Sequence, residues 1–189
     1  MHMYNDLLNY FKSNTTFKIT DKGTRHSYIE NYYNNKFTPL RDANLNILEI
    51  GIDNGYSIML WNGWFTNANI IGLDIKEDSL EKIKALSNAK GIIADAYCLN
   101  TVNMFSDNFF DIIIEDGDHS IEHQRFVTDH WFNKLKPGGT LIIEDIPDIT
   151  KVKYITEAVK KHSITCLDYR HLKNKKWDDI LIEICKSGS

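Results

Sequence analysis

The stretch Asn46-Ile-Leu-Glu-Ile-Gly-Ile-Asp-Asn-Gly-Tyr-Ser57 decides the fold of this chain. Its apolar, β-forming first part predicts a buried strand over 46–50, and the apolar segment that resumes around Ser57 predicts a helix. Gly51 and Gly55 bound the polar turn between them. Glycine tolerates a positive φ and lets another group approach the backbone closely, and the free N–H groups at a helix start suit a carboxylate or phosphate. The turn is therefore a candidate binding loop, although many α/β folds carry a glycine turn for structural reasons alone.

A second strand, predicted over 69–74, ends in the carboxylate of Asp74. Asp74 lies 23 residues after Gly51. This is close to the ~20 residues expected before an acidic side chain that binds ribose hydroxyls in a βαβ nucleotide site. The turn itself reads G-x-x-x-G and lacks the G-x-G-x-x-G pattern of dinucleotide binders. The spacing therefore favours a nucleoside-containing ligand over a dinucleotide.

The rest of the chain alternates strands and helices up to about residue 162. Further strands are predicted over 91–95, 109–115, 140–144, 164–168 and 180–184. Helices are predicted over 4–11, 27–34, 77–86, 101–105, 120–132 and 150–161, with a turn over 135–139. Alternation of this kind predicts a doubly wound, Rossmann-like α/β fold with a mainly parallel seven-stranded sheet and an antiparallel C-terminal strand.

Length and composition suit a single domain over 1–189, in which 1–43 form N-terminal helices with a covering loop and 44–189 form the core. A net charge of −4 without a basic stripe argues against nucleic acid as a partner. Three widely spaced cysteines favour a reducing compartment, and no apolar run approaches the length of a membrane span. We expect a cytoplasmic protein that binds a small molecule, with self-association possible through the N-terminal helices.

Acidic residues fall at the C-terminal ends of five predicted strands, which is where ligands bind in parallel α/β sheets. They are Glu49, Asp74, Asp95, Glu115, Asp116, Glu144 and Asp145. If the strands that end at 115 and 144 are neighbours, three of these carboxylates converge and repel one another, and a divalent cation would remove that cost. An all-oxygen set suits Mg²⁺, Ca²⁺ or Mn²⁺ better than zinc. The alternative is that these side chains cap a helix or meet solvent.

His119 lies three residues beyond Asp116, beside this acidic cluster. Imidazole takes a proton near neutral pH, so His119 is a candidate general base. A lone histidine is otherwise a surface or capping residue, and His123 and His130, on the same predicted helix, are candidates for that role.

Several motifs occur in one order over roughly residues 19–146. They are Thr20-Asp-Lys-Gly-Thr-Arg-His-Ser-Tyr28, Leu48-Glu-Ile-Gly51, Gly55-Tyr-Ser-Ile-Met-Leu-Trp61, Trp64 to Ile75, Glu115-Asp-Gly-Asp-His119 and Leu135-Lys-Pro-Gly-Gly through to Glu144-Asp145. This series resembles the catalytic domain of the macrocin- and mycinamicin-type sugar O-methyltransferases, which are class I S-adenosylmethionine-dependent methyltransferases. The resemblance implies methyl transfer to a sugar hydroxyl.

The resemblance also implies roles for individual residues. Asp116, Glu144 and Asp145 would hold Mg²⁺, and His119, together with Asp116, would carry the catalysis by deprotonating the acceptor hydroxyl. The residues implied to bind S-adenosylmethionine are Thr20, Glu49, Gly51, Gly55, Ser57, Asp74, Ala94, Asp95 and Asp116.

The chain departs from the family pattern in two residues beside the cluster. Asp118 stands where a small residue is more usual, and Glu115 replaces an aspartate. The macrolide-modifying members are also longer, with an extra N-terminal domain, so the acceptor stays open. The alternatives are a catalytically silent S-adenosylmethionine-binding module and a metal-dependent oxygenase of the cephalosporin-hydroxylase type. A nicotinamide-dependent oxidoreductase is disfavoured by the glycine pattern.

Overall fold

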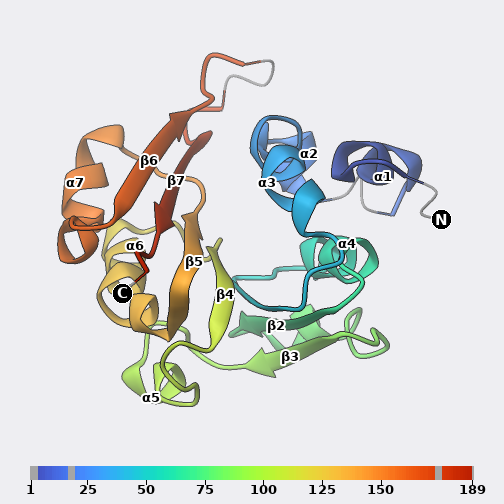
Figure 1. The fold of residues 1–189 in the computed structure, drawn as a ribbon, viewed down its shortest axis with the longest axis horizontal. Helices are drawn as coiled ribbons and strands as arrows, with labels where there is room; N and C mark the ends of the chain where they lie inside the picture. The colour runs from blue at the N-terminus through green and yellow to red at the C-terminus, as the bar shows by residue number, and fades with distance from the viewer. Residues whose placement is uncertain (1–3, 17–19, 173–175, 189) are drawn as a thin grey trace.

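A seven-stranded sheet with strand order β3-β2-β1-β4-β5-β7-β6 forms the centre of the computed structural model, which describes residues 4–16, 20–172 and 176–188 (Figure 1). The strands are β1 (Leu45–Ile50), β2 (Ala68–Asp74), β3 (Ala89–Ile93), β4 (Phe110–Glu115), β5 (Leu135–Ile143), β6 (Ser163–Asp168) and β7 (Ile180–Cys185). Strands β1 to β5 pair in parallel, whereas β7 runs antiparallel to both β5 and β6. The predicted mainly parallel sheet with an antiparallel C-terminal strand is confirmed.

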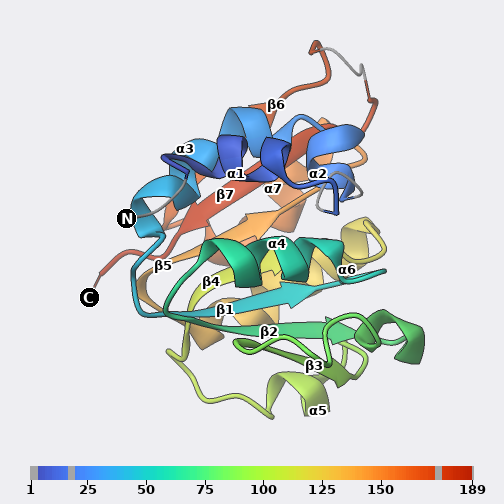
Figure 2. The same cartoon turned by 90° about the vertical axis from the view of Figure 1, so that its right-hand side faces the viewer.

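Short helices cover both faces of this sheet (Figure 2). They are α1 (Leu7–Ser13), α2 (Asp21–Thr24), α3 (Asn34–Phe37), α4 (Tyr56–Trp64), α5 (Leu99–Val102), α6 (Ile121–Phe126) and α7 (Val152–Ile155). A π-helical turn, Ile29–Tyr33, leads into α3, and another, Val127–Trp131, continues α6. None of the helices in the described part of the chain has the length and apolarity needed to cross a bilayer.

Alternate residues along each strand supply two separate cores. On one face, Ile47 and Ile70 pack with the aromatic side chains of α1, α3 and α4, including Trp61 and Trp64. On the other face, residues such as Leu48 pack under α6 and α7. Because side chains in a strand point alternately to opposite faces, the apolar strands of a parallel sheet serve both cores at once.

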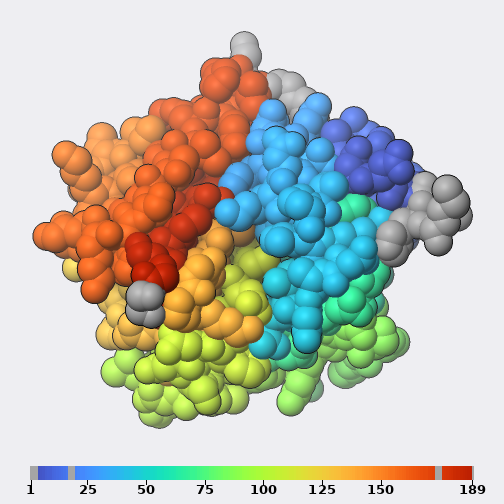
Figure 3. Space-filling view, viewed as in Figure 1, coloured from blue at the N-terminus to red at the C-terminus, as the bar shows by residue number. Residues whose placement is uncertain are grey.

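The N-terminal segment belongs to the first of these cores. Figure 3 shows it, in blue, lying directly against the orange and red C-terminal strands. Lys36 pairs with Glu183 of β7 at 2.9 Å, and the hydroxyl of Tyr32 donates to the same carboxylate. Residues 1–3 and 189 of the predicted domain lie outside the described residues.

Several predicted element boundaries are wrong. Strand β3 ends at Ile93 because its pairing stops with the last residue of β2, so Ala94 and Asp95 follow the strand. The predicted turn 135–139 is instead the irregular start of β5, where the register with β4 shifts.

Two predicted helices are much shorter than expected. The helix predicted over 77–86 is a single 3₁₀ turn, Glu77–Leu80, and the one predicted over 150–161 is broken around Thr156. Between 77 and 86, only Ser79 and Ile83 are buried. A helix draws most of its stability from packing one apolar face, and this segment has little of one.

Candidate functional site

A cavity of about 770 Å³ opens at the carboxyl ends of β1, β2 and β4. Of the residues predicted for the site, it is lined by Thr20, Gly51, Ser57, Asp74, Ala94, Asp95, Asp116 and His119. Glu49, Gly55, Glu144 and Asp145 do not line it. Most of the predicted residues therefore surround one cavity, and the other four do not face it.

The glycine turn brings the end of β1 against the residues that follow β4. Gly51 has a φ of +77°, and a Cβ there would lie 2.2 Å from the carbonyl oxygen of Asp116. The Asp116 N–H donates to the Ile50 carbonyl at 2.9 Å. Glycine is needed here for both the backbone conformation and the close approach.

Helix α4 begins at Tyr56, directly after Gly55, whose φ is +74°. Gly55 is the N-cap residue of this helix, and no side chain caps the N-terminus. Ser57 lies inside the first turn and lines the cavity.

Asp74 is held by backbone N–H groups of the glycine turn and of the segment that follows β2. One carboxylate oxygen accepts from the N–H groups of Ile52 and Asp53 at 3.1 and 3.0 Å, and the other accepts from Lys76 at 2.9 Å. Oδ1 retains the capacity to accept a further bond from a ligand, whereas the two bonds to Oδ2 occupy both of its lone pairs. Asp74 thus holds the glycine turn in place and presents a carboxylate to the cavity.

Glu49 is directed away from the cavity, into the core. Its side chain is fully buried and accepts from the Trp61 indole N–H at 2.8 Å. Its other oxygen lies 3.2 Å from the ammonium of Lys22. Burial raises the pKa of Glu49, and the Lys22 charge opposes that rise.

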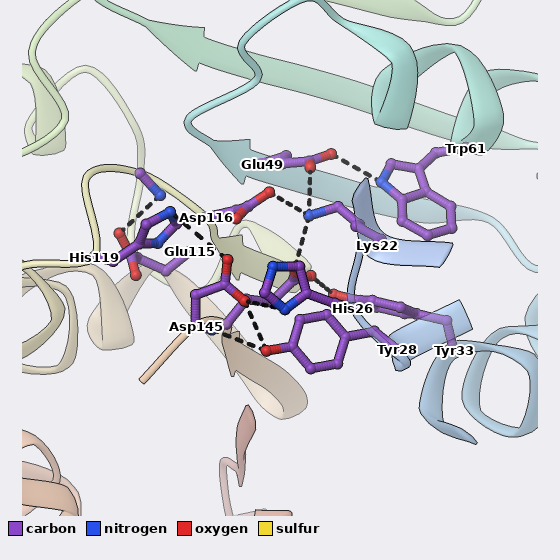
Figure 4. A network of polar contacts seen from close by, with 12 residues as sticks. Lys22, His26, Tyr28, Tyr33, Glu49, Trp61, Glu115, Asp116, His119 and Asp145 are labelled. Atoms are coloured by element: carbon purple, nitrogen blue, oxygen red, sulfur yellow. Dashed lines mark hydrogen bonds and ion pairs between the residues drawn. The ribbon is translucent and has the colours of Figure 1, made fainter. Parts of the chain in front are cut away.

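Lys22 lies at the centre of the acidic cluster and was not assigned a role from the sequence (Figure 4). Its ammonium is 2.5 Å from Asp116 and 2.9 Å from Glu144, in addition to its contact with Glu49. Although burial opposes the charged form, the surrounding carboxylates, Asp116 foremost, raise the pKa of Lys22 well above its ordinary value. Its place in the Thr20-Asp-Lys motif was the one available signal, since burial of a lysine is not visible in a sequence.

The three predicted metal ligands fall into two environments. Glu144 is buried, and its two oxygens are taken by Lys22 and by the hydroxyl of Tyr33. Asp116 and Asp145 can join His119, because one ligand atom from each of the three lies within 4.8 Å of the others. Burial, together with the nearby charge of Asp116, raises the pKa of Asp145 to about 7.

Asp145 is oriented by the N-terminal segment. It has a φ of +54°, and its Oδ1 accepts from the Tyr28 hydroxyl at 2.7 Å. His26 Nδ1 lies 3.3 Å from the same oxygen, while His119 Nε2 lies 3.7 Å from Oδ2. A second group that could hold a cation, formed by His26, Asp145 and Asp178, therefore shares this carboxylate.

The two departures from the family pattern have defined surroundings. Glu115 is fully buried and accepts from the Tyr97 hydroxyl at 2.7 Å, while burial raises its pKa to about 7. Asp118 is half exposed and contacts His123 Nδ1 at 2.8 Å. The His123 ring in turn stacks on Tyr97 with ring centroids 3.8 Å apart. Tyr97, Asp118 and His123 line the cavity, and the sequence did not predict that they form one wall of it.

The chain is similar to proteins of known function. A family model described as "Methyltransferase domain" matches residues 48–146, just over half of the chain. Demethylmacrocin O-methyltransferase of Streptomyces fradiae is 30% identical over 139 residues, which cover 70% of this chain and 35% of that enzyme. Mycinamicin VI 2''-O-methyltransferase of Micromonospora griseorubida is 30% identical over 122 residues, which cover 61% of this chain and 30% of that enzyme. The chain thus spans about a third of the length of these relatives.

A solved structure is similar over almost the whole chain. The MycE methyltransferase of the mycinamycin biosynthetic pathway, in complex with Mg, SAH and mycinamycin VI, superposes with a TM-score of 0.71 at 20% identity. The match covers 98% of this chain and 55% of that one. At this identity it establishes the fold, and together with the relatives it confirms the resemblance predicted from the motifs. Because the family model spans the glycine turn and the acidic cluster in a single match, this chain belongs to the methyltransferase domain family.

Proposed function

We propose that this chain is a Mg²⁺-dependent O-methyltransferase that transfers the methyl group of S-adenosylmethionine to a hydroxyl of a sugar or a sugar-containing small molecule. One observation carries the proposal. A single cavity extends from the glycine turn and Asp74, which suit a nucleoside, to Asp116 and His119, which suit hydroxyl activation. The names of the relatives, which are sugar O-methyltransferases, support the same reaction.

The cofactor end of the cavity matches the parts of S-adenosylmethionine. Asp74 would accept hydrogen bonds from the ribose hydroxyls, and Ala94 and Asp95 would lie beside the adenine. The glycine turn, with Ser57 and Thr20, would surround the methionine part. Aspartates predominate among the charged groups of the lining, which favours a cofactor that carries a positive sulfonium.

The residues present fit a hard divalent cation. Asp116 and Asp145 supply carboxylate oxygens close to His119, and oxygen donors are what Mg²⁺ prefers. Glu144 would join the set only if it left Lys22 and Tyr33. When bound there, Mg²⁺ would lower the pKa of an acceptor hydroxyl and hold a neighbouring oxygen in place.

His119 would take the proton of the acceptor hydroxyl. Its Nδ1 is buried, so Nε2, which faces Asp145, is the nitrogen left to receive the proton. The Asp145 carboxylate would stabilise the imidazolium that forms, and Tyr28 holds that carboxylate in position. S-adenosylmethionine supplies the methyl group, whose bond to sulfur breaks as its bond to the acceptor oxygen forms.

Methyl transfer from radiolabelled S-adenosylmethionine to a panel of sugar nucleotides and glycosides tests the proposal. We expect incorporation with Mg²⁺ and its loss in EDTA. His119→Ala should lower the rate by about 10²-fold or more, the range for general-base catalysis, while cofactor binding is unchanged. His162→Ala is the matched control, because His162 lies just before β6 and outside the cavity lining, where its ring contacts Ser187 and Phe132.

Two outcomes would contradict the proposal. Transfer that survives EDTA would exclude the metal, and transfer that survives His119→Ala would exclude the base. Cofactor binding without incorporation into any acceptor of the panel would instead favour a catalytically silent binding module.

A further inference from the structure

The ammonium of Lys22 has no part in the chemistry proposed above, yet it is almost completely enclosed by the site. The side chain is 1% exposed and ends between the carboxylates of Glu49, Asp116 and Glu144, at 3.2, 2.5 and 2.9 Å. A lysine is almost never fully buried unless its charge is paired. Lys22 therefore supplies the positive charge that lets these carboxylates share a dry site.

Two of its three partners are the carboxylates that the family pattern gives to the metal. The contacts of Lys22 are made to Asp116 Oδ2 and Glu144 Oε2. A divalent cation held by the same oxygens would stand within a few ångströms of the ammonium, where like charges repel strongly in a poorly solvated site. The two cations cannot both be bound at full strength.

We propose that Lys22 is an internal competitor of the divalent cation. Its ammonium neutralises Asp116 and Glu144 in the metal-free protein, and metal binding displaces it from them. The inference rests on the proposed function only for the nature of the metal. Lys22 thereby lowers the metal affinity of the site while keeping the empty site folded.

The competition has a consequence for the cofactor. Lys22 belongs to α2, and its neighbours Thr20, Asp21 and Arg25 line the cavity. When the ammonium leaves the cluster, this segment of the cavity wall loses the bonds that tie it to Asp116 and Glu144. Metal and cofactor binding should therefore be coupled, and by linkage each should change the affinity of the other by the same factor.

Mn²⁺ titration, followed by the electron paramagnetic resonance signal of the free ion, tests the competition without cofactor or acceptor. We expect Lys22→Met to bind Mn²⁺ at least about tenfold more tightly than the wild type, because a repelling charge is removed. Lys36→Met is the matched control, since Lys36 pairs with Glu183 away from the cluster. Its Mn²⁺ affinity should equal that of the wild type.

The melting temperature provides a second test of the effect of Lys22→Met. Without metal, Lys22→Met should melt below the wild type because its carboxylates have lost their counter-charge, and Mn²⁺ should raise its melting temperature more than that of the wild type. If the single variant does not fold, the double variant Lys22→Met with Glu49→Gln is used instead. It also removes the negative charge of Glu49, the one partner of Lys22 that is not a proposed metal ligand. The double variant should again bind Mn²⁺ more tightly than the wild type.

If the folded Lys22 variants bind Mn²⁺ as tightly as the wild type or more weakly, the proposal is overturned. Lys22 would then help to position the metal ligands instead of competing with the metal. Absence of Mn²⁺ binding at millimolar concentration would overturn it as well. Failure of the methyltransferase proposal would appear separately, in cofactor titration and methyl transfer, neither of which enters this measurement.

Discussion

Glu115 shows how strongly the site perturbs a single carboxyl group. Burial raises its pKa from 4.5 to about 7. Because the folded state holds this proton more tightly than the unfolded chain, the group stabilises the fold below pH 4.5 and loses that contribution as pH rises through 7. We expect the unfolding free energy of the wild type, relative to Glu115→Gln, to fall by up to about 3 kcal/mol over this window.

Urea unfolding at a series of pH values measures this difference. Glu183 is the control, because its pKa is shifted in the opposite direction to that of Glu115. Although burial opposes the shift, hydrogen bonds from Tyr32 and Lys36 lower the pKa of Glu183. Its contribution is therefore present above its unfolded pKa and is lost as pH falls. A difference between wild type and Glu115→Gln that stays flat across the range would show that Glu115 ionises normally.

At the scale of single residues, the sequence predicted which side chains face the cavity when they stand at the end of a strand. Asp74, which ends β2, and Asp116, which directly follows β4, were expected at the edge of the sheet where the cavity lies. Lys22 was not, because its partners Asp116 and Glu144 lie 94 and 122 residues away along the chain. The contact between Tyr97 and Glu115 was missed for a similar reason, since it depends on how the loop after β3 packs.

At the scale of the element, the turn between β1 and α4 depends on glycine for two separable reasons. At Gly51, alanine would have to adopt a positive φ, and its Cβ would clash with the Asp116 carbonyl. At Gly138, φ is also positive, at +81°, but no atom lies within 4 Å of an added Cβ. We expect Gly138→Ala to cost about 1 kcal/mol and Gly51→Ala about 3 kcal/mol or more. Equal losses of urea-unfolding free energy would show that the close approach at Gly51 does not matter.

Strands were predicted better than helices, for a physical reason. A buried parallel strand is marked by its own apolar run, as in 109–115. The helices predicted over 77–86 and 150–161 have few residues to bury. The first is therefore reduced to a 3₁₀ turn, and the second to the short helix α7 between two 3₁₀ turns. Helical periodicity alone does not show how much of a face the sheet will cover.

At the scale of the whole molecule, the N-terminal segment and the sheet share one core. Phe37 of α3 packs on Trp61 of α4 with ring centroids 5.2 Å apart, and Tyr33 reaches Glu144 at the end of β5. The topology itself followed from the alternation of elements. The covering role of 1–43 was predicted, whereas its polar contacts with the acidic cluster were not.

This shared core predicts that the chain unfolds as one unit. Trp61 and Trp64 report the core on one face of the sheet, and Trp131 reports the other. Tryptophan fluorescence and far-ultraviolet circular dichroism should therefore give coincident urea transitions. Two separate transitions would mean that 1–43 and 44–189 are independent units.

Titration of S-adenosylhomocysteine by calorimetry measures directly whether the cavity binds the cofactor product. We expect one site per chain with micromolar affinity, weakened about 100-fold or more by Asp74→Ala, because that carboxylate both receives the ribose and fixes the glycine turn. Asp78→Ala, at an exposed neighbouring position, should bind as the wild type does. Absence of binding by the wild type, or equal binding by Asp74→Ala, would contradict the account.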